Sequence, residues 1–268
     1  MQNSMKFKVS RIVTQDLNKA NYAQGLKAFL QKNPTFKTEY LMTQGGFIDF
    51  KFSNFQDYPL SKFNGLIPID IYKEAENHLN LFLANLGLNI FDYCEILTIG
   101  IDGKNDVGTT IELVAIVRNN MPIIWTGKSY PTSGEINHLM RIDNLDSHFV
   151  TINGERVAIL GCHDLNIYSS RGRSKLINGS TKNQINQQYR KELQQFNPEI
   201  VLQHPHTTHH PLIWRNSWNN LLKANSAVTT YASGICYFDS KKSIKPSRNK
   251  LNSVLSLTKS IDCCDIII

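Results

Sequence analysis

The segment 156–164 places a cysteine where chemistry would be expected, at the end of an apolar stretch. Residues 156–160 predict a strand, and Gly161 and Cys162 follow directly. A thiol at the carboxyl end of a strand, just before a sharp turn, lies near backbone N–H groups. Such groups lower the pKa of a thiol and bind an oxyanion. Taken alone, a cysteine in this position is more often an inert, packed thiol, because free cysteines are among the most buried residues.

Charged residues near other predicted strand ends could complete such a site. Lys128 leaves the strand before it, where an ammonium group would stabilise an oxyanion or a nearby thiolate; a solvated surface lysine is the alternative. Glu135 is equally compatible with the first turn of a helix behind a serine cap. Arg171 and Arg173 follow the cysteine turn and suit bidentate binding of a carboxylate or phosphate, or else begin a solvated helix.

A histidine cluster lies further along the chain, at His204, His206, His209 and His210. Closely spaced histidines can bind Zn²⁺, which would indicate a metal-dependent hydrolase. No carboxylate lies within the cluster, so a polar loop, or a role for His206 in lining a pocket, is a better interpretation than a metal site. We predict no metal site here.

Two segments together, 125–135 and 149–164, resemble the nitrilase superfamily of carbon–nitrogen hydrolases. In that family a lysine leaves one strand, a second glutamate follows, and a hairpin leads to the nucleophilic cysteine. These positions fall on Lys128, Glu135 and Cys162, and Asp164 completes the pattern of strand, cysteine, any residue, then an acidic residue. Low similarity extends over residues 6–238.

The resemblance implies a four-layer αββα sandwich of two mixed sheets. It implies that Cys162 attacks a small amide through a thioester intermediate, while Lys128 and a backbone N–H hold the negative charge. It also places the loop of His206 beside the pocket. From their positions after Cys162, we expect His163, Arg171 and Arg173 to lie beside the substrate as well. No metal or organic cofactor is needed, and a homo-oligomer is expected because the family commonly pairs its sandwiches.

The main departure from the family pattern is at Gln44, where the family has its general-base glutamate. A glutamine cannot accept a proton as a carboxylate does, and loss of a positioned base costs about 10²–10⁴ in rate. Three explanations fit: a variant inactivated to trap substrate, a natural pseudoenzyme, or another base such as His163 or His206. A catalytically silent binding or scaffold protein is therefore the alternative to a hydrolase.

Strands and helices that alternate along the chain must position these residues. Tight turns are expected at 102–103 and 118–120. Hydrophobic periodicity predicts helices at 18–30, 69–86, 184–196 and 212–223, and strands at 6–13, 38–43, 89–100, 110–117, 122–125, 149–152, 156–160, 199–202, 227–231 and 235–238. The pattern indicates one α/β domain over residues 1–268, with 239–268 as a shortened tail whose apolar end would dock on a neighbour.

Composition excludes several classes of protein. The chain has 268 residues, 41% of them hydrophobic, which is ordinary for a globular protein. Five cysteines without a C-x-x-C pair argue against a disulfide framework or a structural zinc site. The net charge of +7 comes from scattered residues, so no nucleic-acid groove is predicted. Without a long apolar run or a signal-peptide core, we expect no membrane contact and a cytoplasmic location.

Overall fold

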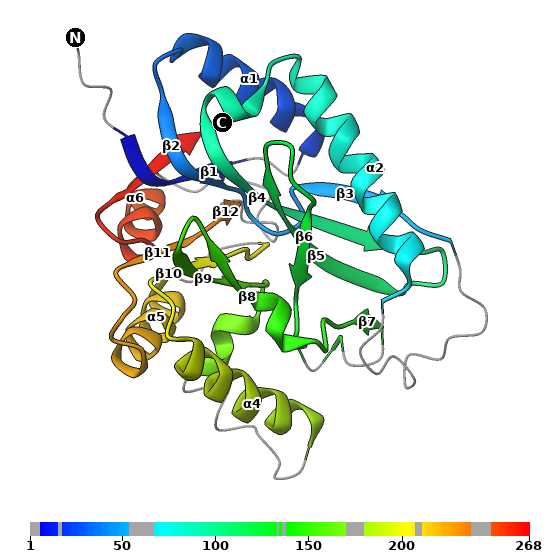
Figure 1. Ribbon diagram of the computed structural model, residues 1–268, viewed down its shortest axis with the longest axis vertical. Helices are drawn as coiled ribbons and strands as arrows, with labels where there is room; N and C mark the ends of the chain where they lie inside the picture. The colour runs from blue at the N-terminus through cyan, green and yellow to red at the C-terminus, as the bar shows by residue number, and fades with distance from the viewer. Residues whose placement is uncertain are drawn as a thin grey trace.

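Two β-sheets face each other in this protein, with helices on both outer faces (Figure 1). The computed structural model describes residues 6–15, 18–53, 67–132, 134–135, 138–169, 180–206, 211–236 and 248–268. Within these ranges, the larger sheet has nine strands and the smaller has four.

The element bounds follow the predicted order closely. The helices are α1 (Tyr22–Lys32), α2 (Ile69–Leu86), α4 (Thr181–Phe196), α5 (Pro211–Ala224) and α6 (Arg248–Leu257). The strands of the larger sheet are β1 (Lys6–Thr14), β2 (Lys37–Met42), β3 (Ile48–Lys51), β4 (Cys94–Lys104), β5 (Thr110–Arg118), β6 (Ile124–Gly127), β7 (Leu139–Met140), β12 (Ile235–Cys236) and β13 (Cys263–Ile267). Those of the smaller sheet are β8 (Phe149–Ile152), β9 (Glu155–Leu160), β10 (Ile200–Gln203) and β11 (Thr230–Ser233).

Both sheets are mixed. The larger has the order β12-β1-β2-β4-β5-β6, parallel from β12 to β4 and antiparallel from β4 to β6. The smaller has the order β11-β10-β9-β8, and only its β8–β9 hairpin is antiparallel. Parallel strands end at the same edge of a sheet, so the segments after β9 and β10 lie together.

Three separate apolar layers show how the sheets and helices stack. One contains Leu26 of α1 and Leu79 of α2 against Leu113 of β5, and so lies outside the larger sheet. A second joins Val114 of β5 to Ile159 of β9, between the sheets. A third packs α4 and α5, including both Trp214 and Trp218, on the outer face of the smaller sheet. The predicted four-layer αββα sandwich is confirmed.

The ends of individual elements have local causes. Helix α2 ends where Gly87 adopts a left-handed conformation (φ 59°), the usual C-terminal cap. Helix α4 begins after Ser180, whose side chain accepts the backbone N–H of Asn183. The turn predicted at 118–120 is present, with Asn120 at φ 54°.

The turn predicted at 102–103 was wrong, because β4 continues through it to Lys104. Gly103 instead makes room for the ring of Phe50, since a Cβ at this position would lie 2.5 Å from the Phe50 Cζ. That ring belongs to β3, an unpredicted strand that pairs with β4. The chain reverses at 105–108, where Gly108 has φ 88°.

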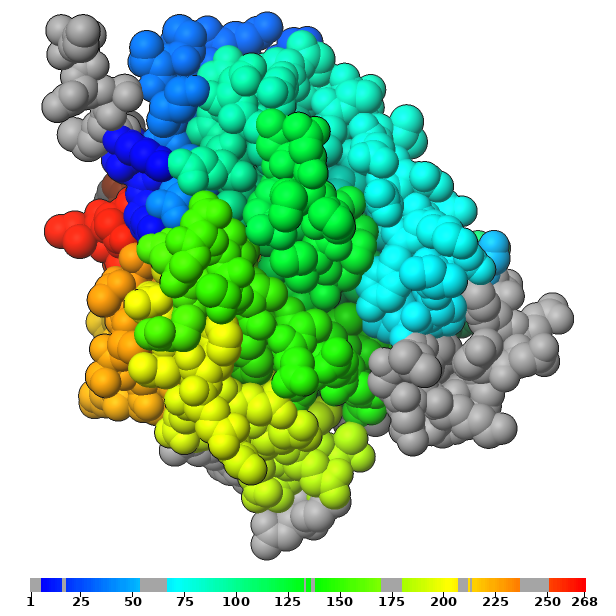
Figure 2. All heavy atoms as spheres, in the orientation of Figure 1, coloured from blue at the N-terminus to red at the C-terminus, as the bar shows by residue number. Residues whose placement is uncertain are grey.

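The apolar C-terminal segment docks on this chain itself. Strand β13 pairs in parallel with β1, from Val9 opposite Cys263 to Val13 opposite Ile267. The neighbour on which this segment was expected to dock is therefore β1 of the same chain. Among the described helices, none is long and apolar enough to cross a bilayer. On the face shown in Figure 2, α2 lies beside the β5–β6 hairpin, where Tyr72 packs on Trp125.

Candidate active site

Cys162 lies directly beyond β9, in a turn held by Asp164. One oxygen of the Asp164 carboxylate accepts the N–H of Gly161 at 2.7 Å. The other accepts the N–H groups of Ser129 and Tyr130, at 3.1 and 2.7 Å. One buried side chain therefore ties the turn after β9 to the segment after β6. Asp164 is a positioning residue for both Cys162 and Lys128.

Gly161 allows the two strand ends to approach closely. A Cβ at position 161 would lie 2.5 Å from Lys128 Cα and 2.8 Å from its backbone nitrogen. Real Cβ atoms essentially never come so near, so only glycine fits without a backbone shift. This contact joins the smaller sheet, which carries the thiol, to the larger sheet, which carries the ammonium group.

Lys128 is buried between two carboxylates. Its Nζ lies 2.7 Å from Glu112 and 2.8 Å from Glu135, and the residue is only 1% exposed. Burial lowers the pKa of Lys128, but the charges of Glu112 and Cys162 and the hydrogen bonds to Glu112 and Glu135 together outweigh burial, and the net shift is upward. Burial raises the pKa of Glu135, yet Lys128 brings it down to about 2. The structure thus brings the predicted Glu135 against Lys128, in a turn and not in a helix.

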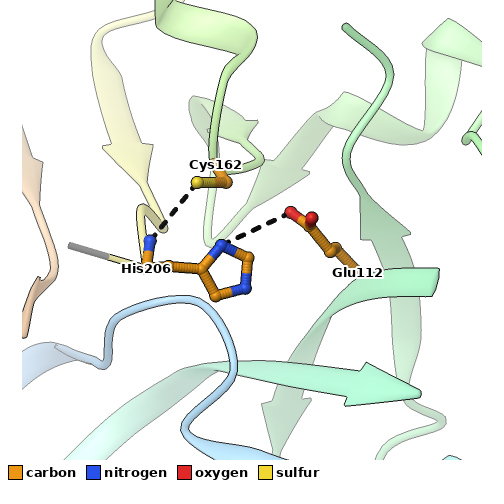
Figure 3. Close-up of side chains that lie close together, drawn as sticks. All are labelled: Glu112, Cys162 and His206. Carbon is orange, nitrogen blue, oxygen red and sulfur yellow. Dashed lines mark hydrogen bonds and ion pairs between the residues drawn. The ribbon is translucent and has the colours of Figure 1, made fainter. Parts of the chain in front are cut away.

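His206 contacts the Cys162 thiol and two carboxylates, those of Asp102 and Glu112. Its backbone N–H donates to the Cys162 Sγ at 3.3 Å. Its ring Nε2 lies 2.6 Å from the Asp102 carboxylate, while Nδ1 lies 3.6 Å from that of Glu112 (Figure 3). An imidazole between a thiol and a carboxylate is the arrangement that orients and charges a catalytic histidine.

The electrostatics favour a thiolate–imidazolium pair. Burial raises the pKa of the Cys162 thiol, but the charges of His206 and His163 outweigh it and leave the pKa well below its usual value. Burial lowers the pKa of each histidine, whereas Cys162 raises it, and the net shift for both is upward. His163 also lies 2.8 Å from the Asn166 side chain, through its Nδ1.

Glu112 and Asp102 are site residues that sequence reasoning missed. Asp102 on β4 lies directly opposite Glu112 on β5 in the strand pairing. The backbone N–H of Lys128 donates to the Glu112 carbonyl at 2.9 Å. A signal was present in the sequence. Glu112 shares the two-residue period of Val114, whose side chain faces the smaller sheet. A carboxylate on the inward face of an apolar strand is uncommon unless it is paired.

A cavity of ≈ 770 Å³ reaches these residues. Glu112, Asp102 and Glu135 line one part of it, and Phe50 and Ile111 give it an apolar part. Its size falls in the range of small-molecule sites, about 300–1,000 Å³. Glu112 is the link between this cavity and the thiol, because its carboxylate also lies within 4.8 Å of the Cys162 Sγ.

Gln44 follows β2 and is buried, but its amide is engaged elsewhere. Its Nε2 donates to the Thr14 Oγ1 on β1 at 3.0 Å. Within the described part of the chain, no donor pairs with its Oε1. Arg171 and Arg173, predicted to bind substrate, lie outside the described residues.

The structure gives little support to a histidine metal site. His204 is fully buried, and burial lowers its pKa to about 3. His209 and His210 lie outside the described residues. Across the described ranges, donor atoms gather only at Glu112, Cys162 and His206. The Lys128 ammonium, 2.7 Å from Glu112, would repel a cation there, so we assign no metal to this group.

No protein-family model and no curated protein matches this chain. Among solved structures, it is similar to glutamine-dependent NAD⁺ synthetase from Acinetobacter baumannii (13% identity, 85% of this chain and 38% of that one, TM-score 0.49). It is also similar to a carbon–nitrogen hydrolase from Helicobacter pylori (9%, 95% and 78%, TM-score 0.45). A third is a mutant amidase of the nitrilase superfamily from Nesterenkonia (8%, 86% and 74%, TM-score 0.44).

This chain thus spans little more than a third of the length of the synthetase, at 38%. Carbon–nitrogen hydrolases of the nitrilase superfamily are among the structures that it resembles, which is the superfamily that segment 125–164 resembles in sequence. Because the identities are at most 13% and the TM-scores at most 0.49, any functional proposal depends on the geometry of the site.

Proposed function

We propose that this protein is a cysteine-dependent carbon–nitrogen hydrolase that cleaves a small amide through a thioester on Cys162. One observation carries the proposal: a thiol of lowered pKa lies at a strand end that packs directly on Lys128, which is buried between two carboxylates. A surface-exposed lysine and an inert cysteine would need neither the glycine contact nor the paired charges.

The first half of the reaction uses the ion pair that the site favours. The Cys162 thiolate attacks the amide carbon, and the carbonyl oxygen becomes an oxyanion. Lys128 has three N–H donors, of which Glu112 and Glu135 take two, so one remains for that oxyanion. The imidazolium of His206 gives its proton to the departing nitrogen as the C–N bond breaks. The product is a thioester on Cys162 and a free amine or ammonia.

The alternative is a catalytically silent binding protein. Gln44 favours it, because the family resemblance places the general base at this position and the amide of Gln44 donates to Thr14. In that case the cavity beside Glu112 would hold a ligand without cleaving it.

Turnover on simple amides distinguishes the two. The native protein is incubated with a panel of primary amides of short carboxylic acids, and released ammonia and the intact protein mass are measured. A hydrolase predicts ammonia release, or an acyl mass gain on Cys162, with at least one amide. Cys162→Ala should abolish both.

Cys264→Ala is the matched control, because burial raises the pKa of that thiol and it lies on β13. This variant should behave like the native protein. Neither ammonia nor a mass gain with any amide of the panel would contradict the hydrolase and favour the binding protein.

A further inference from the structure

Glu112 is a carboxylate in the middle of the site for which the first half of the reaction has no chemical use. It lies on β5 and faces the smaller sheet, with a side chain only 15% exposed. One oxygen, Oε1, pairs with Lys128 at 2.7 Å. The other, Oε2, is buried and has no hydrogen-bond donor among the described residues.

The free oxygen points to the place where a proton acceptor is needed. Oε2 lies 3.6 Å from Nδ1 of His206. The Glu112 carboxylate, the His206 ring and the Cys162 Sγ lie within 4.8 Å of one another, and Glu112 also lines the cavity (Figure 3). A water that attacks an acyl group on Sγ would therefore lie within reach of this carboxylate.

We propose that Glu112 is the general base of this enzyme and takes the proton from the water that hydrolyses the thioester. The inference rests on the proposed hydrolase function and assigns its second half. It also explains how a chain with glutamine at position 44 could turn over, because the carboxylate comes from β5 and not from the end of β2.

The proton balance closes through the same contacts. The water oxygen bonds to the thioester carbon while its proton goes to Glu112. The C–S bond then breaks, which releases the carboxylic acid and restores the Cys162 thiolate. Glu112 passes its proton across the 3.6 Å contact to His206, which gave up its own proton to the leaving nitrogen. The thiolate–imidazolium pair and the ionised Glu112 are regenerated.

The charges around Glu112 suit a base that works near neutral pH. Burial raises the pKa of Glu112, and so do the charges of Cys162 and Asp102. The charges of His206 and Lys128 lower it, and the resulting pKa is about 7. A carboxyl group with such a pKa can both accept a proton from water and release it again.

An activated ester separates the two halves of the reaction. p-Nitrophenyl acetate acylates a reactive thiol without a fitted amide pocket. The first rapid release of p-nitrophenolate measures acylation, and the later steady rate measures deacylation. In Glu112→Gln we expect the rapid phase to remain and the steady rate to fall about 10²–10⁴-fold. Intact mass should show a lasting acetyl group on Cys162.

Further variants and a rescue experiment show whether a slow Glu112→Gln has lost a base or has a disturbed fold. Glu112→Asp keeps a carboxylate and should recover part of the deacylation rate. Hydroxylamine, a stronger nucleophile than water, should release the acetyl group from Glu112→Gln. Glu199→Gln is the matched control, because Glu199 lies directly before β10, at the opposite end of that strand from His206. This variant should leave both phases unchanged. The native steady rate should rise with pH through about 7, and Glu112→Gln should lack this rise.

Results of two kinds would overturn the inference, and they have different consequences. Deacylation as fast in Glu112→Gln as in the native protein, or no recovery in Glu112→Asp, removes Glu112 as the base but leaves the Cys162 hydrolase standing. A rapid phase that persists in Cys162→Ala shows that another group is acylated. That result removes the proposed function together with the base.

Discussion

At the scale of single residues, the lowered pKa of Cys162 depends on the neighbouring charges, which act against burial. The residue is 5% exposed, and burial alone would make its thiol inert. Two histidines reverse this, and Asp102 in turn keeps His206 charged. The sequence showed His163 and His206 as candidates, but the partner of His206 lies 104 positions away on β4. No pattern of spacing reveals such a pair.

This charge balance predicts the pH dependence of alkylation at Cys162. A thiol of lowered pKa is already a thiolate at low pH, so its rate with iodoacetamide should be nearly constant between about pH 6 and pH 8.5. In His206→Asn the pKa should rise toward the ordinary value, and the rate should then increase with pH. Peptide mapping by mass spectrometry gives the rate at each cysteine.

Cys264 provides an internal control in the same samples, because burial raises the pKa of its thiol. Its rate should climb steadily with pH. A native Cys162 rate that climbs in the same way would contradict the thiolate–imidazolium pair.

At the scale of elements, strands and helices with clear periodicity were predictable, and the contacts between them were not. Helix α2 was predicted with its observed bounds because its apolar spacing and the Gly87 cap agree. Strand β4 was misjudged at both ends. Residues 90–92 form a 3₁₀ helix before it, and Gly103 serves the packing of Phe50 and not a turn. A glycine looks the same in sequence whether it permits a turn or a close contact.

The same limit applies to the site. Cys162, Lys128 and Glu135 came from a family resemblance, and the structure brings Lys128 against Glu135 and beside the cysteine turn. Glu112 and Asp102 escaped because their role depends on β4 and β5 presenting one face to the other sheet. That arrangement is a property of the sandwich and not of either strand alone.

The close contact at Gly161 predicts the effect of adding one methyl group. Gly161→Ala places a Cβ against the Lys128 backbone, so the two strand ends must separate. We expect the free energy of unfolding in urea to fall by about 1–3 kcal/mol. Iodoacetamide alkylation of Cys162 should then vary with pH more like that of an ordinary thiol.

Gly134→Ala is the matched control, because a Cβ there meets nothing within 4 Å. Its free energy of unfolding should change by no more than about 0.5 kcal/mol. Equal stability of the two variants would show that the strand ends adapt freely and that Gly161 does not fix the site.

At the scale of the whole molecule, the site exists only where the two sheets meet. The smaller sheet provides Cys162 and His206, and the larger provides Asp102, Glu112 and Lys128. Neither sheet provides all three of the site's components, the Cys162 thiol, the carboxylates and the Lys128 ammonium group, by itself. The relative position of the sheets, set by the apolar layer between them, therefore determines the chemistry.

The C-terminal segment belongs to this framework through Arg11 on β1. The side chain is fully buried and its Nε lies 2.5 Å from the Asp265 carboxylate on β13. It also donates to the carbonyl groups of Leu255, Thr258 and Ser233. One guanidinium thus joins β1, β11, β13 and the end of α6, so the described part of the predicted tail, residues 248–268, is tied to the rest of the fold.

Removing that guanidinium should destabilise the whole fold. Arg11→Met keeps much of the side-chain volume but removes the buried donors of the Ser233 and Leu255 carbonyl groups and leaves Asp265 paired with Lys259 alone. We expect the free energy of unfolding in urea to fall by about 3–5 kcal/mol. Lys73→Ala, which breaks the exposed ion pair with Asp70, should leave stability nearly unchanged. If Arg11→Met unfolds at the same urea concentration as Lys73→Ala, Arg11 does not stabilise the C-terminal strand. The pairing of β13 with β1 must then account for its position.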